Sequence, residues 1–157
     1  MRNWFWIVVL MAISSCDISR VYETNLDLPN QQWVTGDVES FEFEIADVDQ
    51  SYNVLVNVTN AQHYPFHNLY YQYELIGPDD GLVKKELVNI NLFDPKTGEP
   101  FGEGLGDLFD HRQLILQDFE FPESGKYIMN LEHYMRRDTL PLIKSIGLRV
   151  EQYSVEK

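Results

Sequence analysis

Hydrophobic and polar residues alternate along most of the chain with a period of two. In the segment 41–45, Phe41, Phe43 and Ile45 alternate with Glu42 and Glu44. Successive side chains of a β-strand point to opposite faces, so this pattern predicts a strand with one buried face. The same kind of pattern predicts seven further strands, at residues 20–24, 52–58, 69–75, 83–93, 113–121, 126–135 and 145–153. No segment shows a useful helical stripe.

Turn residues separate these predicted strands. All seven prolines fall between them, at positions 29, 65, 78, 95, 100, 122 and 141, where a missing backbone N–H costs no ladder hydrogen bond. Residues 77–81 and 122–125 are rich in proline, glycine and acidic residues, and we expect both to be hairpin connections. The predicted fold class is all-β: a two-sheet antiparallel β-sandwich of about eight strands, of which a jelly roll is one form.

One segment interrupts the alternation. Residues 94–111 contain four glycines, at positions 98, 102, 104 and 106, and we interpret them as one long loop. Loops of this length inside a compact domain tend to be functional or mobile. A phosphate cradle is excluded, because no amphipathic helix follows and Glu99, Glu103 and Asp107 would repel phosphate.

The chain begins with the features of a lipoprotein signal peptide. Arg2 precedes an apolar run at residues 4–13, which is too short to span a bilayer as a helix. Ser14, Ser15 and Cys16 follow, and Ile13 to Cys16 resembles a bacterial lipobox. We predict cleavage before Cys16 and acylation of Cys16 with membrane-anchoring chains such as palmitate. An ordinary signal peptide that contains a cysteine, or a buried N-terminal strand, is the alternative.

Residues 16–157 then form the mature protein, which we expect to be a single β-sandwich domain behind a signal peptide of residues 1–15. Cys16 is the single cysteine, so an intramolecular disulfide is excluded. The formal net charge of −13 becomes one unit more negative when Arg2 is removed. Such a surface repels nucleic acid and anionic lipid headgroups, although solubility alone accounts for this charge.

Three aspartates of the long loop are candidate calcium ligands. Asp94, Asp107 and Asp110 could supply hard oxygen ligands together with backbone carbonyls. Their spacing matches no EF-hand, and the alternative, which we favour, is that they cap backbone N–H groups of a wide turn. No metal site is therefore firmly predicted.

Motifs for catalysis are absent from the sequence. Pro65 prevents a regular helix that would pair His63 with His67, and the other two histidines are isolated, so zinc is not expected. We expect all four histidines to be exposed or to have hydrogen-bond partners. No Gly-x-Ser-x-Gly segment occurs. We expect a protein without enzymatic activity and without a cofactor.

Aromatic residues are the remaining candidates for a binding surface. Tyr70 should face away from Tyr71 and Tyr73, because neighbouring residues of a strand point to opposite faces. An exposed tyrosine row could stack on a sugar or receive a partner strand, whereas core packing is the more common use of such residues. Tyr64, Tyr70 and Trp33 are the candidates, with Trp33 also expected to plug one end of the sandwich. Thr139, within Asp-Thr-Leu, is a candidate O-glycosylation site.

Taken in order, several segments resemble those of the gliding-motility lipoprotein family GldH, over nearly the whole chain. They are Ser-Cys-Asp (15–17), Arg-Val-Tyr-Glu (20–23), Leu-Pro-Asn-Gln-Gln-Trp (28–33), Tyr-Asn-Val (52–54), Asn-Leu-Tyr (68–70), Leu-Phe-Asp-Pro-Lys-Thr-Gly (92–98), Gly-Leu-Gly-Asp-Leu-Phe-Asp-His (104–111), Tyr-Met-Arg-Arg-Asp-Thr-Leu-Pro (134–141) and Gly-Leu-Arg-Val-Glu (147–151).

This resemblance implies a cell-envelope lipoprotein that gliding requires and that is linked to the secretion system for motility adhesins. It implies no catalytic residue, and Cys16 is the one functional residue carried over. We expect a lipid anchor in the outer membrane facing the periplasm, and partners among the gliding or secretion envelope proteins. The competing hypothesis is a lipid-anchored glycan-binding module, either dependent on calcium or independent of it, built on the aromatic segment 69–75 and the acidic glycine loop.

Overall fold

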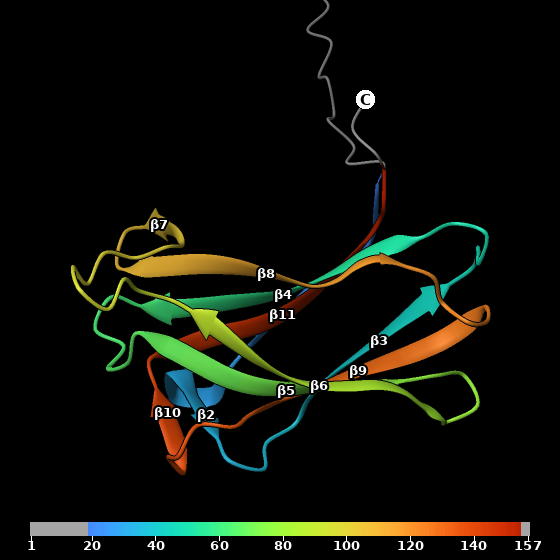
Figure 1. Ribbon diagram of the computed structural model, residues 1–157. Coiled ribbons are helices and arrows are strands. Elements are labelled where there is room, and N and C mark those ends of the chain that lie inside the picture. Colours follow the sequence, from blue (N-terminus) through green and yellow to red (C-terminus); the bar gives the residue numbers. More distant parts are fainter. Residues whose placement is uncertain (1–18, 155–157) are drawn as a thin grey trace, which may run out of the picture.

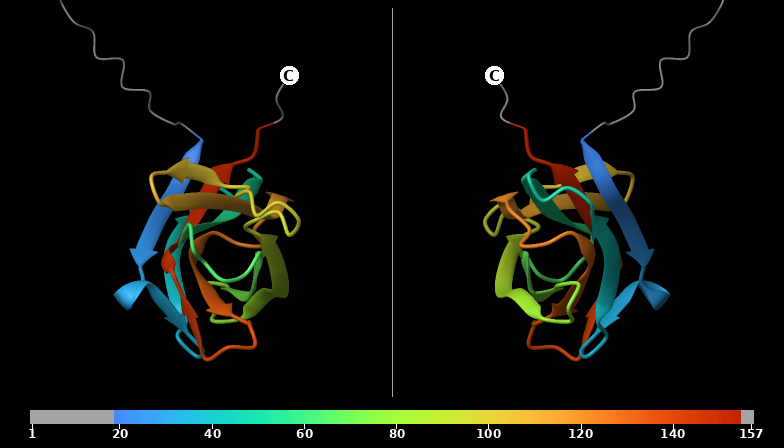
Figure 2. Two further views of the ribbon diagram at one scale, coloured as in Figure 1. Left: turned by 90° about the vertical axis from the view of Figure 1, so that its left-hand side faces the viewer. Right: turned by 90° about the vertical axis from the view of Figure 1, so that its right-hand side faces the viewer.

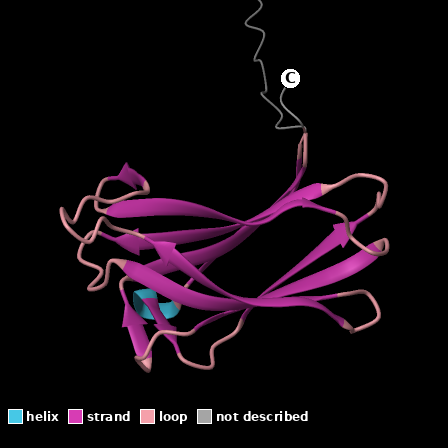
Figure 3. Cartoon of the chain, viewed as in Figure 1, coloured by secondary structure: helices cyan, strands magenta, loops and turns pink. Residues whose placement is uncertain are grey.

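The computed structural model describes residues 19–154 and shows two antiparallel sheets packed face to face (Figure 1). Short 3-10 helix η1 (Pro29–Gln31) is the one helical element in this part of the chain (Figure 3). The long strands are β1 (Arg20–Asp27), β3 (Glu39–Ile45), β4 (Tyr52–Ala61), β5 (Asn68–Ile76), β6 (Leu82–Asn91), β8 (Leu108–Phe119), β9 (Gly125–His133) and β11 (Ile143–Gln152). Three short strands are β2 (Gln32–Val34), β7 (Glu103–Leu105) and β10 (Thr139–Pro141).

The order of the long strands is that of a jelly roll. One sheet has the order β1-β11-β4-β8-β7 and the other has the order β3-β9-β5-β6. When the short β7 is left out, the pairs of neighbouring strands β1–β11, β3–β9, β4–β8 and β5–β6 are nested one inside the next along the sequence. Such nesting is what the two Greek keys of a jelly roll require. The end-on views of Figure 2 show the two sheets enclosing the space that the core side chains fill. The predicted antiparallel sandwich is confirmed.

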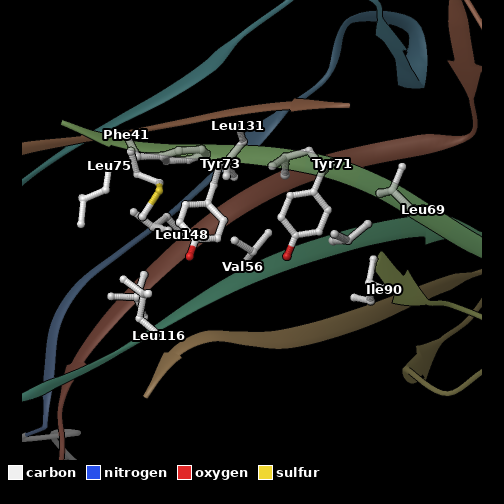
Figure 4. Close-up of a cluster of buried hydrophobic side chains, with 14 of the residues drawn as sticks. Phe41, Val56, Leu69, Tyr71, Tyr73, Leu75, Ile90, Leu116, Leu131 and Leu148 are labelled. Atoms are coloured by element: carbon white, nitrogen blue, oxygen red, sulfur yellow. The ribbon is translucent and has the colours of Figure 1, made fainter. Parts of the chain in front are cut away.

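Alternation along the strands builds the core. In β4 every second residue from Tyr52 to Asn60 is buried, and in β5 the buried set runs from Leu69 to Leu75. Tyr71 and Tyr73 point from β5 toward the opposite sheet (Figure 4). A fully buried large apolar side chain contributes roughly 1.5–3 kcal/mol of transfer free energy. Because a shift of one residue would turn all of these side chains to the solvent face, the inner faces fix the register of both sheets.

Two sequence-based predictions about connections are wrong. Residues 94–111 are not one loop, because β7 and the start of β8 form a hairpin whose turn contains Gly106 at φ +65°. Gly102, Gly104 and Gly106 hid this hairpin, since they have no side chains from which an alternating pattern could be read. Residues 122–125 do not join a hairpin either: they carry the chain from β8 in one sheet to β9 in the other. Turn residues specify a chain reversal, but not the sheet that the next strand joins.

Trp33 closes one end of the core. It lies on β2, which pairs with β10, and only 1% of its surface is exposed. Its indole N–H donates a 3.0 Å hydrogen bond to the carbonyl oxygen of Asp37, and its ring meets the edge of His133 at a centroid distance of 5.6 Å. The two-stranded β2–β10 sheet thus acts as a plug.

The described chain enters the fold at the opposite end of the strands. The carbonyl oxygen of Ser19 accepts a 2.7 Å hydrogen bond from the N–H of Gln152, next to the start of β4 and the end of β8. We call this the N-terminal end. The far end of the sandwich carries three connections: 62–67 between β4 and β5, 92–102 between β6 and β7, and 134–138 between β9 and β10.

An ion-pair network fastens β1 to the sheet. The guanidinium of Arg149 on β11 lies 3.0 Å from the carboxylate of Glu23 and 2.7 Å from that of Glu151. Burial alone would raise the pKa of Glu23, but the hydrogen bond from Arg20 and the charge of Arg149 outweigh it, and the pKa is lowered. Glu23 is therefore ionised at neutral pH and holds the first strand in place.

Candidate functional site

A groove lies on the outer face of the four-stranded sheet, at the far end of the sandwich. Its cavity volume is about 480 Å³. Aromatic, aliphatic and arginine side chains line it: Phe66, Tyr70, Leu87, Tyr134, Met135, Arg136 and Arg137. We call these seven residues the tyrosine groove.

Strand alternation places Tyr70 in the tyrosine groove. Tyr71 and Tyr73 are completely buried, whereas Tyr70 points outward with 39% of its surface exposed. The backbone of Tyr70 faces β9, because its carbonyl oxygen accepts a 2.7 Å hydrogen bond from the N–H of Tyr134. Its own N–H donates to Sδ of Met135 at 3.3 Å. Tyr70 on β5 and Tyr134, which directly follows β9, are both exposed, and these bonds hold them at a fixed spacing.

Two arginines give the tyrosine groove a positive rim. The guanidinium carbon of Arg137 lies 5.9 Å from the ring centroid of Phe66, within the range of a cation–π contact. Thr35 holds this segment, since its hydroxyl donates to the carbonyl oxygen of Arg137 at 3.0 Å and its N–H to that of Asp138 at 2.8 Å. Arg136 and Arg137 are exposed, and within residues 19–154 neither takes part in an ion pair.

These side chains offer contacts that suit binding. Tyrosine faces and Leu87, which is 54% exposed, offer apolar contact, and the arginines offer bidentate hydrogen bonds to a carboxylate. No carboxylate, histidine, serine or cysteine lines the tyrosine groove.

Of the three aromatic residues predicted for a binding surface, the structure exposes one. Tyr70 lines the tyrosine groove, but Trp33 belongs to the core, so its prediction as a surface residue is wrong. Tyr64 is also buried, with 6% exposed, and its ring packs edge-on against Phe66. Burial raises the pKa of Tyr64. Tyr64 borders a separate cavity of about 280 Å³ shared with Phe93.

Sequence reasoning missed most of the tyrosine groove. Leu87 occupies an outward position of β6, where an apolar side chain breaks the polar half of the alternation. Tyr134, Arg136 and Arg137 follow β9 in a stretch without buried apolar residues until Leu140. Two adjacent arginines beside a tyrosine in a strongly acidic chain were the available signal.

The three calcium candidates do not converge. Asp94 instead accepts hydrogen bonds from the N–H groups of Lys96 and Thr97 at 2.7 and 2.9 Å, and those bonds, first that from Thr97, lower its pKa. Asp110 accepts from the hydroxyl of Thr59 at 2.6 Å. Within the described residues no three acidic, histidine or cysteine side chains gather to hold a metal ion. The turn-capping alternative describes Asp94.

Two histidines are buried away from the tyrosine groove. Burial lowers the pKa of His111 to about 4 and also lowers the pKa of His133. His133 lies 3.4 Å from the hydroxyl of Thr35, but Nε2 of His111 has no hydrogen-bond partner within residues 19–154. The expectation that every buried histidine is satisfied is therefore wrong for this nitrogen and for Nδ1 of His133, which also has no hydrogen-bond partner in the described part of the chain. His63 and His67 are exposed, as expected.

Cys16, the predicted lipid-attachment residue, lies outside the described residues. Thr139, the glycosylation candidate, lies on β10 with its side chain partly buried. Between residues 19 and 154 the structure contains no helix with the length and apolar character needed to cross a bilayer.

Comparisons with known proteins agree with one another on the family. The family model described as GldH lipoprotein matches residues 20–150. The "Gliding motility lipoprotein GldH homolog" of Christiangramia forsetii is 27% identical over 156 residues, covering 95% of this chain and 94% of that protein. The "Gliding motility lipoprotein GldH" of Flavobacterium johnsoniae is 27% identical over 155 residues, covering 93% and 94%.

Among solved structures, the VP2 subviral particle of infectious bursal disease virus matches with a TM-score of 0.45 and 17% identity. The match covers 86% of this chain and 33% of that one, and nothing about function follows from it. The family match spans most of the sequence, including every long strand of both sheets except the last two residues of β11. The family expected from the sequence segments is thus confirmed, and the chain belongs to the GldH lipoprotein family.

Proposed function

We propose that this protein is a lipid-anchored component of the bacterial gliding machinery that binds another envelope protein through the tyrosine groove and catalyses no reaction. The names of two relatives support the gliding role, since both are gliding motility lipoproteins. The observation that carries the binding role is the groove itself, an exposed aromatic surface with two arginines that form no ion pair among residues 19–154, on a chain of net charge −13.

The position of the groove suits a tethered binding protein. Lipidated Cys16 stands three residues before Ser19, a reach of about 10 Å in extended chain. The ten-residue strands make the sandwich roughly 30 Å long, and the tyrosine groove is at the end away from Ser19. In this proposal the anchor sits in the outer membrane and the groove faces the periplasm, where the envelope parts of the gliding and secretion machinery would reach it.

Complementation of a gliding strain that lacks its own copy tests the proposal. The native chain is expected to restore gliding, whereas Cys16→Ser and the double variant Tyr70→Ser with Tyr134→Ser are expected to reduce single-cell gliding at least tenfold. Immunoblots of membrane fractions establish that the double variant is present at the native level. Normal gliding by the deletion strain, or by the double variant at native abundance, would refute the proposal.

A glycan ligand is the second candidate, because amides surround the tyrosines. Asn68 donates to the side-chain oxygen of Asn89 at 2.7 Å, and Gln72 donates to the hydroxyl of Tyr134 at 3.4 Å. Tyrosine rings flanked by amides are suited to stacking and hydrogen bonding with sugars. A glycan array probed with the detergent-solubilised full chain, with and without calcium, decides: binding that Tyr70→Ser abolishes would favour this candidate over the protein partner.

A further inference from the structure

The outer strand of the four-stranded sheet, β6, leaves half of its length open. In an antiparallel pair, alternate residues turn their backbone groups toward the neighbouring strand and away from it. The N–H of Leu92 points toward the β5 side, since it donates to the carbonyl oxygen of His67, the residue before β5, at 2.8 Å. The carbonyl oxygen of Tyr70 is taken by Tyr134 on the β9 side. Asn89 lies opposite Tyr70, and its backbone therefore faces the open edge.

The same alternation turns the backbones of Leu87 and Asn91 outward. The chain's own segment covers the edge only beyond this point, where Phe101 donates to the carbonyl oxygen of Leu92 at 3.0 Å. The uncovered stretch is thus residues 87–91, roughly 16 Å of edge on which the outward N–H and C=O groups of Leu87, Asn89 and Asn91 have no backbone partner among residues 19–154. Such an edge pairs readily with another chain unless the sequence prevents it.

The first half of β6 is protected against pairing, and the second half is not. Lys84 and Glu86 point to the inner face of this edge strand and lie 3.8 Å apart, and Glu86 also accepts from the hydroxyl of Tyr73 at 3.0 Å. Inward charges are a known way to prevent edge pairing. Residues 87–91 carry no charge, and the outward side chain of Leu87 is 54% exposed.

The other long edges differ. On β3, which ends the same sheet on the far side, the outward positions are Ser40, Glu42 and Glu44. On β1, Glu23 is engaged with Arg20 and Arg149. Residues 113–117 of β8, which extends beyond the short β7, are also uncharged, so it is the tyrosine groove beside Leu87 that distinguishes residues 87–91 from this second open edge.

Cavities flank this segment on both faces. On the outer face Leu87 forms one wall of the tyrosine groove. On the inner side a cavity of about 290 Å³ lies between Ile90 and Phe101 of one sheet edge and Arg112 of the other. Glu103 and Asp110 also line this second cavity, so its charge is mixed. Alternate side chains of a strand laid along residues 87–91 would point to these two cavities.

We propose that residues 87–91 of β6 accept an extended segment of a partner protein as an added strand, with an acidic side chain reaching Arg136 and Arg137. This inference rests on the proposed function and specifies how the partner binds. Charge complementarity selects the occupant: the exposed arginines favour a carboxylate, while a second copy of this chain would bring a further net charge of −13. Backbone hydrogen bonds supply affinity and the two cavities supply specificity.

Photo-crosslinking in the complemented strain, with the full lipidated chain, tests the proposal. Benzoylphenylalanine is placed at Asn91 on the open edge and, as the matched control, at Ser40 on edge strand β3. The Asn91 position is expected to give an ultraviolet-dependent protein adduct and the Ser40 position none. Mass spectrometry is expected to map the adduct to a segment that alternates apolar and polar residues and has an acidic residue within three positions.

Three variants examine the mechanism. Asn89→Pro removes the edge N–H, Asn89→Asp keeps the backbone but repels an acidic strand, and Arg136→Glu with Arg137→Glu reverses the rim. Each variant is expected to lower the yield of the adduct at least tenfold. If the proline variant does not fold, Asn89→Asp still tests the proposal, because it keeps the backbone N–H. An absent adduct, equal adducts from both positions, survival in Asn89→Asp, or mapping to a lipid, a glycan or a helical segment would overturn strand addition.

The two proposals fail separately. If Asn89→Asp glides normally while Tyr70→Ser with Tyr134→Ser does not, the tyrosine groove is required but strand addition is wrong. If both variants glide normally at native abundance, the proposed function fails as well.

Discussion

The N–H of Tyr134 donates a 2.7 Å hydrogen bond to the carbonyl oxygen of Tyr70, which extends the β5–β9 ladder one residue beyond the end of β9. The bond brings two exposed tyrosines from neighbouring strands onto one face and fixes the direction in which the chain continues to Arg136 and Arg137. The tyrosine groove is therefore a continuation of the sheet and not a property of a free loop.

Thr35 should hold the backbone around Arg137 and Asp138 in a fixed conformation. Thr35→Val removes the 3.0 Å hydrogen bond from its hydroxyl to the carbonyl oxygen of Arg137 and is expected to cost about 1 kcal/mol of unfolding free energy. Amide hydrogen exchange at Arg137 and Asp138 should accelerate several-fold. Thr35→Ser keeps the hydroxyl and serves as the control; equal exchange in both variants would contradict this role.

The two core tyrosines should respond oppositely to loss of the hydroxyl. The hydroxyl of Tyr71 is buried and has no hydrogen-bond partner within the described chain, whereas that of Tyr73 donates to Glu86 at 3.0 Å. A buried unsatisfied polar group costs about 1–3 kcal/mol, so Tyr71→Phe is expected to stabilise the fold by about 1 kcal/mol. Tyr73→Phe is expected to destabilise it by about 1 kcal/mol. Urea unfolding of both variants decides, and destabilisation by Tyr71→Phe would refute this reading of its hydroxyl.

His111 should make the fold sensitive to acid. Its pKa is about 4 in the folded state and 6.5 in an unperturbed chain, so the unfolded chain binds a proton first as pH falls. The stability contribution is complete above pH 6.5 and is lost progressively down to about pH 4. The total is on the order of 3 kcal/mol, because one unit of pKa corresponds to about 1.4 kcal/mol.

Urea unfolding of the native chain and His111→Gln between pH 7.5 and 4 measures this contribution as the difference between the two curves. Subtraction removes the effect of carboxylates common to both. The difference should shrink as pH falls. His63→Gln, at an exposed histidine, should parallel the native chain, and a pH-independent difference for His111→Gln would count against the buried neutral imidazole.

Gly147 should tolerate no side chain. An added Cβ would collide with the side-chain oxygen of Asn25 and lie 2.9 Å from the carbonyl oxygen of Thr24 on β1. Gly147→Ala is expected to cost about 1–3 kcal/mol, and Asn25→Ala in the same chain should recover part of that loss. Thermal unfolding of the single and double variants measures the coupling; strictly additive effects would show that Asn25 is not the obstacle.

The sequence predicted the eight long strands, but neither their partners nor the short strands β2, β7 and β10. The alternation of Phe41, Phe43 and Ile45 or of Val54, Val56 and Val58 reports a local property, namely that one face of each strand is buried. Pairing joins β1 to β11, whose residues lie more than a hundred positions apart, and no local pattern encodes that choice. The β7–β8 hairpin was hidden for a related reason, since Gly104 and Gly106 replace the side chains from which the pattern is read.

The candidate site was predicted in one residue, Tyr70, because alternation alone assigns it to the outer face. Leu87, Tyr134 and the arginines were missed, since they meet Tyr70 only through the pairing of β5 with β6 and β9. Trp33 was wrongly included in the binding surface, because a tryptophan after a turn gives no periodic signal and the β2–β10 pairing buries it. The structure does place it at one end of the sandwich, as the sequence also suggested.

We expect gliding to require the face of the sandwich that bears the tyrosine groove. The most direct measurement compares Leu87→Asp, in the groove, with Val48→Asp, which is 40% exposed at the N-terminal end, in the complemented deletion strain. Both variants exchange an exposed apolar side chain for the same charge. At equal abundance, single-cell gliding is expected to fall at least tenfold with Leu87→Asp and to stay at the native level with Val48→Asp. Normal gliding with Leu87→Asp, or equal loss with both variants, would contradict the claim.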